Sequence, residues 1–70
     1  MKDTTKLFFL YVQVHQGRTA EDIMNMIAEV EGDESFERRK ELSEAYAYLL
    51  KHQHIKVDDK TNVVSVRGVV

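Results

Sequence analysis

Three consecutive basic side chains are the residues of this sequence best suited to specific chemistry. Arg38, Arg39 and Lys40 stand together in a segment with helical spacing. Arginine presents a planar fork of donors that can bind phosphate oxygens or guanine edges, and lysine adds a positive charge on a flexible stem. Glu34 and Glu41 could pair with the cluster at three- and four-residue spacing, and Glu37 and Glu41 would repel phosphate. The cluster is therefore either a nucleic-acid contact or a self-neutralised helix surface.

Histidine is the second residue type that could bind a ligand. His52 and His54 lie two residues apart, and side chains at this spacing on a strand share one face. A zinc site needs further ligands, but the chain has no cysteine and His15 is distant in sequence. Surface histidines near a helix C-terminus, where positive charge is favoured, are the simpler interpretation. We therefore expect no metal site and no cofactor.

Catalytic motifs are absent from the sequence. The serines Ser35, Ser43 and Ser65 stand in no GxSxG elbow, and the three glycines are isolated and form no phosphate-binding loop. The carboxylate pair Asp58-Asp59 belongs to a predicted turn. We therefore expect a protein that is not an enzyme.

Length and composition indicate one small domain over residues 1–70. A chain of 70 residues is near the lower limit for a self-sufficient core. Its hydrophobic content of 43% favours a folded chain over a disordered one. Without cysteine, stability must come from tight helix packing or from oligomerisation. A homodimer is thus one expected arrangement.

The apolar run from Leu7 to Val12 is far shorter than the roughly 20 residues that a membrane span needs. No small-residue cleavage site follows it. These observations predict a cytoplasmic protein that makes no contact with membranes.

Charge is distributed unevenly along the chain, whose formal net charge is −2. Residues 1–35 carry three basic and seven acidic side chains, and residues 36–70 carry seven basic and five acidic ones. Such asymmetry is one expected sign of a nucleic-acid face on the second half of the chain.

The first element has two interpretations. A helix to about His15, capped by Asp3 or Thr4, would align Leu7, Leu10, Tyr11 and Val14 on one face. A strand would instead align Phe8, Leu10, Val12 and Val14, and aromatic and β-branched residues favour it. We expect the helix and keep the strand as the alternative.

Two further helices follow. Thr19 is a good N-cap for a second helix whose apolar stripe ends at Val30, and Gly32 stops it. Ser35 is the expected N-cap of a third helix, from about Phe36 to Gln53.

A hairpin ends the chain. The run from Ile55 to Asp58 alternates as a strand does, residues 58–62 form a turn with Asn62 at positive φ, and Val63 to Arg67 return before Gly68. The predicted core comprises Leu10, Val14, Ile23, Ile27, Leu42, Leu49, Ile55 and Val64.

Two segments resemble a winged helix-turn-helix domain. VHQGRTAEDIMNMI is similar to the end of a first helix and the start of a second, and AYAYLLKHQHIKVDDKTNVVSV is similar to a third helix running into a wing. The turn EVEGDES is more acidic than is usual there, and Gln53 stands where a glycine is common. The resemblance implies a mainly α fold with three helices and a small β-hairpin. A β-α-α-β-β arrangement is the alternative, if the first element is a strand.

The resemblance also implies a transcriptional regulator that binds double-stranded DNA. The start of the third helix would enter the major groove, where Arg38, Arg39 and Lys40 would contact bases and phosphates. Lys56, Lys60 and Arg67 on the wing would contact the flanking backbone.

A protein–protein interaction module is the alternative function. A small inhibitor, adaptor or dimerising protein would use exposed aromatic side chains to bind its partner. The candidates are Phe8, Phe9, Tyr11 and Tyr48.

Overall fold

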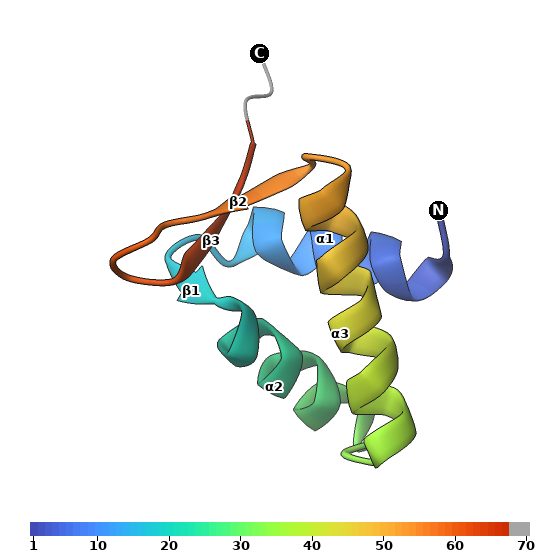
Figure 1. The fold of residues 1–70 in the computed structure, drawn as a ribbon. Helices are drawn as coiled ribbons and strands as arrows, with labels where there is room; N and C mark the ends of the chain where they lie inside the picture. Colours follow the sequence, from blue (N-terminus) through green and yellow to red (C-terminus); the bar gives the residue numbers. More distant parts are fainter. Residues whose placement is uncertain (68–70) are drawn as a thin grey trace.

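The chain folds into three helices and a small antiparallel sheet (Figure 1). The structure is a computed structural model that describes residues 1–67, so Gly68 lies outside the described residues. In chain order the elements are α1 (Asp3–Val14), β1 (Arg18–Thr19), α2 (Ala20–Glu31), α3 (Phe36–Lys51), β2 (Ile55–Val57) and β3 (Val63–Val66). The predicted class, mainly α with a small β component, is confirmed. This order of elements is compatible with a winged helix.

Helix α1 confirms the helical interpretation of the first element. It begins at Asp3, one residue earlier than a cap at Asp3 requires and two earlier than a cap at Thr4 requires, because Lys2 occupies the N-cap position. Lys2 makes no side-chain capping bond, although its carbonyl accepts a hydrogen bond from the Lys6 N–H at 3.0 Å. The predicted side-chain cap at the start of α1 is therefore wrong.

The buried face of α1 also differs from the prediction. Phe8 and Val12 are 0% exposed, whereas Leu10 and Val14 are 52% and 65% exposed. The Phe8 ring packs beside the Tyr46 ring of α3, with 6.0 Å between ring centroids. Apolar residues surround α1 on almost every side, so periodicity does not select the face that turns inward. Leu10 and Val14 are thus wrong as core residues.

Helix α2 has the predicted boundaries. The Thr19 hydroxyl accepts a hydrogen bond from the Asp22 N–H at 3.1 Å, and Gly32 ends the helix at φ 67°. The Asp33 N–H donates to the Ala28 carbonyl at 3.1 Å, which completes a Schellman motif with Gly32. Val30 is 74% exposed, because the last turn of α2 extends beyond the core. Its predicted place in the buried stripe is wrong.

Helix α3 starts as predicted and ends two residues early. The Ser35 hydroxyl accepts a hydrogen bond from the Arg38 N–H at 3.2 Å. At the other end, Gln53 adopts φ 60° and the His54 N–H donates to the Leu49 carbonyl at 2.9 Å. Gln53 therefore occupies the left-handed position of a Schellman motif, which glycine usually fills. The helix ends at Lys51 because the chain leaves the helical conformation at this Schellman motif.

The sheet contains one strand that the sequence did not predict. The strand order is β1-β3-β2, with Val64 of β3 opposite both Arg18 of β1 and Val57 of β2. The β2–β3 hairpin and the positive φ of Asn62 are confirmed. Strand β1 has two residues, too few to produce an alternating pattern.

The core lies where the three helices meet the sheet. Six of the eight predicted core residues are buried, namely Ile23, Ile27, Leu42, Leu49, Ile55 and Val64. Phe8, Val12 and Ala45 complete the main cluster.

Replacing Gln53 by glycine should stabilise the domain. A residue with a Cβ in the left-handed region costs about 1 kcal/mol relative to glycine, which adopts that region without strain. Chemical denaturation of Gln53→Gly should therefore show unfolding free energy higher by about 1 kcal/mol. Gln53→Ala keeps the Cβ and should show no such gain. A destabilised glycine variant would contradict the assignment of strain to this position.

Candidate nucleic-acid interface

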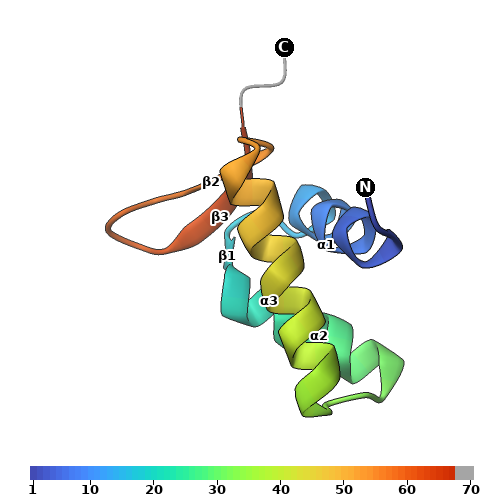
Figure 2. The same ribbon diagram turned by 45° about the vertical axis from the view of Figure 1, so that its right-hand side comes forward.

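The outward side of α3 is a stripe of charged residues around one alanine. Glu37, Lys40, Glu44, Ala47 and Lys51 follow one another at three- or four-residue spacing, and all five are exposed. The helix crosses the front of the molecule with α1 and α2 behind or beside it (Figures 1 and 2). Because the charges alternate in sign along the helix, this surface is close to neutral.

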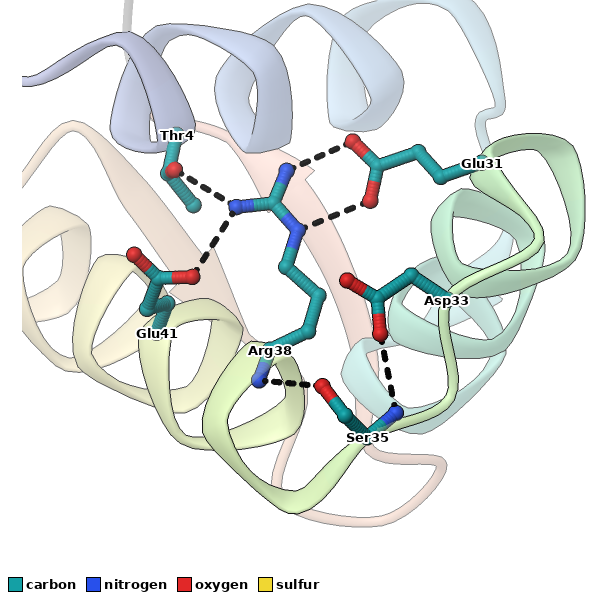
Figure 3. A network of polar contacts seen from close by, with 6 residues as sticks. All are labelled: Thr4, Glu31, Asp33, Ser35, Arg38 and Glu41. Atoms are coloured by element: carbon teal, nitrogen blue, oxygen red, sulfur yellow. Dashed lines mark hydrogen bonds and ion pairs between the residues drawn. The ribbon is translucent and has the colours of Figure 1, made fainter.

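Arg38 points the opposite way, into the space between the three helices (Figure 3). Its Nε and Nη2 donate to the two carboxylate oxygens of Glu31, at 2.7 Å and 2.6 Å. Its Nη1 donates to the Thr4 hydroxyl at 2.8 Å and to a Glu41 carboxylate oxygen at 3.4 Å. The Arg38 side chain is only 15% exposed.

This network changes the interpretation of the basic cluster. Both carboxylate oxygens of Glu31 bind the same guanidinium, which is the strong fork geometry for an arginine–carboxylate pair. Hydrogen bonding from Arg38 lowers the pKa of Glu31, so the pair stays charged at neutral pH. A phosphate group would have to compete with two carboxylates and a hydroxyl for Arg38. In this arrangement Arg38 holds the helices together.

The other two members of the cluster remain on the surface. Arg39 is exposed and donates one hydrogen bond, from Nη2 to the Asn25 Oδ1 at 2.9 Å. Lys40 is exposed on the outward stripe. Three consecutive residues therefore point in three directions, since each residue of a helix turns by about 100°.

The hairpin carries the remaining predicted cations. Lys56 lies between buried Ile55 and half-buried Val57, so its side chain projects from the other face of β2. Lys60 lies in the turn after β2, and Arg67 follows β3. All three cationic side chains are exposed.

The turn of the hairpin is also acidic. The Asp58 carboxylate accepts hydrogen bonds from the backbone N–H groups of Lys60 and Thr61, at 2.8 Å and 3.0 Å. These bonds lower the pKa of Asp58. The carboxylate therefore fixes the turn that presents Lys60.

The sequence analysis did not identify the exposed cations Lys51 on α3 and Arg18 on β1. Lys51 lies on the outward stripe of α3, eleven residues after Lys40, and the three- and four-residue spacing along the helix could have identified it. Arg18 lies in β1, where nothing in the sequence indicated a strand.

The predicted partner-binding aromatics divide into buried and accessible side chains. Phe8 is fully buried, so its predicted place on a partner surface is wrong. Phe9 packs edge-on against His54, Tyr11 packs against His15, and both are half-buried. Tyr48 is exposed, and its ring centroid lies 4.2 Å from the ring centroid of His52.

His52 and His54 lie on the surface just after the end of α3. The ring centroids of His52 and His54 are 6.5 Å apart. Within residues 1–67, no three side chains of the kinds that bind metals gather in one place.

Comparison with protein-family models, with curated proteins and with solved structures finds no match to this chain. Among residues 1–67, no helix is long and apolar enough to cross a membrane.

The Glu31–Arg38 pair should make stability depend on pH in the acid range. The pKa of Glu31 is lowered in the folded chain, so the pair stabilises it fully above the ordinary value of about 4.3. The contribution declines as pH falls further and is lost once the pH is below the lowered pKa. Because Glu31 is partly exposed and screened, Glu31→Gln should cost about 1 kcal/mol at pH 7.

Thermal or chemical unfolding of both proteins between pH 2 and pH 8 measures this difference. Glu29→Gln is the matched control, since Glu29 is an exposed glutamate on the same helix. An equal cost of Glu31→Gln at pH 7 and pH 2 would contradict the role assigned to the pair.

Proposed function

We propose that this chain is a winged helix-turn-helix DNA-binding domain that regulates transcription. The observation that carries the proposal is the uncovered outward side of α3, with Lys40 near its start, Lys51 in its last turn and Lys56 on the adjoining strand β2. The order of helices and strands supports the same fold assignment. Fold similarity alone is only an analogy for function, and these exposed cationic side chains are what would bind phosphate.

The proposed recognition surface is the outward stripe of α3. Ala47 is a small side chain in its second half, which permits close approach to base edges. Lys40 on the stripe and Arg39 beside it supply donors for phosphates and guanine, and Glu44 can accept a hydrogen bond from a cytosine amino group. Arg38 contributes indirectly, because it fixes the start of α3 against α1 and α2.

The proposed wing contacts are Lys56, Lys60 and Arg67. These side chains are exposed on or beside the β2–β3 hairpin and would bind backbone phosphates. Nearby Asp58 and Asp59 oppose them, and the chain is acidic overall. We therefore expect weak binding by a single chain and tighter binding by two chains on a two-fold symmetric site. We also propose that the protein is located in the cytoplasm.

Fluorescence anisotropy with duplex DNA over a range of salt concentrations tests the proposal. About six phosphate contacts give a slope near −5 in log affinity against log salt. The double variant Lys40→Ala/Lys56→Ala should weaken binding and reduce the magnitude of the slope by about 2, since each contact contributes about 0.9.

The matched control is Lys2→Ala/Lys6→Ala, which removes the same charge from exposed positions at the start of α1. This control should keep the wild-type slope. Absence of binding at low salt, or equal effects of the two double variants, would contradict the proposed interface.

A protein-interaction module is the second candidate, and the exposure of large apolar side chains favours it. Val30 and Phe36 are exposed at the α2–α3 end, and Tyr48 is exposed on α3. Such side chains are typical of a partner surface when they form a contiguous patch. Failure of all DNA binding, together with a folded protein, would favour this candidate.

A further inference from the structure

Helix α1 has a second apolar stripe, on the side away from the core. The stripe contains Leu7, Leu10, Tyr11 and Val14. Leu7 precedes Leu10 and Tyr11 by three and four residues, and Val14 follows them by four and three, which is the spacing of one helix face. Leu10 and Val14 are exposed, whereas Leu7 and Tyr11 are half-buried at the margin, where they also pack against the core. In Figure 2, α3 lies on one side of α1 and no other helix or strand lies on the opposite side. The spacing is that of a helix that packs against another helix.

We propose that this stripe binds the same stripe of a second copy of the chain, with the two α1 helices antiparallel about a two-fold axis. In this pairing Leu7 lies opposite Val14 of the partner subunit, and Leu10 lies opposite Tyr11 of the partner subunit. Two-fold symmetry produces each contact twice. Every member of the stripe therefore gains an apolar neighbour.

The charges at the two ends of α1 favour this orientation and this partner. Asp3 lies in the first turn and Arg18 lies just beyond the last turn, and both are exposed. Within residues 1–67 neither of them forms an ion pair. Antiparallel pairing brings Asp3 of each chain near Arg18 of the other. A parallel pair would bring Asp3 near Asp3 and Lys6 near Lys6, which is repulsive.

The size of the stripe determines the expected affinity. Four side chains over about two helical turns form a small interface, below the range of stable permanent dimers. We therefore expect a reversible dimer with a dissociation constant on the order of micromolar to 100 µM. The proposed dimer surface is separate from the proposed DNA interface, because none of the predicted phosphate contacts belongs to α1.

Sedimentation equilibrium of the full chain without DNA tests the proposed dimer. The mass should rise from that of one chain toward that of two as concentration increases through the micromolar range. Leu10→Glu should weaken association about tenfold or more, since it places two charges in the centre of the interface. Ser43→Glu is the matched control, because it adds the same charge at an exposed position of α3 that belongs to none of the proposed surfaces. Far-ultraviolet circular dichroism verifies that both variants remain helical.

A charge exchange tests the orientation. Asp3→Arg alone and Arg18→Asp alone should each weaken the dimer, because each brings like charges together. The double variant Asp3→Arg/Arg18→Asp should restore it. A monomer at every concentration, a dimer insensitive to Leu10→Glu, or a double variant that is not restored would overturn the proposal. The experiment measures mass in the absence of DNA, so its result does not depend on whether the chain binds DNA.

Discussion

One guanidinium group links all three helices through hydrogen bonds. Arg38 on α3 binds Glu31 at the end of α2 and Thr4 at the start of α1, and it also contacts Glu41 on its own helix. The Schellman motif at Gly32 and the Ser35 cap fix the short connection between α2 and α3, which sets the distance from Glu31 to Arg38. A lysine could not replace this arginine, because it lacks the planar fork that binds both carboxylate oxygens.

This network determines which part of α3 can meet a ligand. With Arg38 turned inward, the helical rotation turns Lys40 outward and leaves Arg39 at the side, near Asn25. Within the basic cluster, Arg38 therefore stabilises the fold, whereas Arg39 and Lys40 are exposed to solvent. An outward stripe in which Glu37 and Glu44 alternate with lysines has little net attraction for phosphate. Any affinity for DNA must therefore come from several weak contacts spread over α3 and the hairpin.

The sequence predicted the features that depend on local chemistry. Thr19, Gly32, Ser35 and Asn62 act through neighbouring backbone groups, so their residue types identify the turns and caps. Features that depend on distant partners were not predictable. Arg38 meets Thr4 across 34 residues of sequence, and β1 exists only because β3 pairs with it. The buried face of α1 was also not predictable, because apolar residues on both sides of a helix do not show which side packs against the core.

The two apolar faces of α1 connect the proposed dimer to the proposed recognition helix. The inner face packs Phe8 against Tyr46 of α3, and Thr4 at the start of α1 accepts a hydrogen bond from Arg38. Because of this ring packing and this hydrogen bond, we expect α1 to move together with α3. If the outer face of α1 binds its copy, the separation of the two α3 helices follows from rigid contacts and not from a linker. A fixed separation of two recognition helices is what a two-fold DNA site requires.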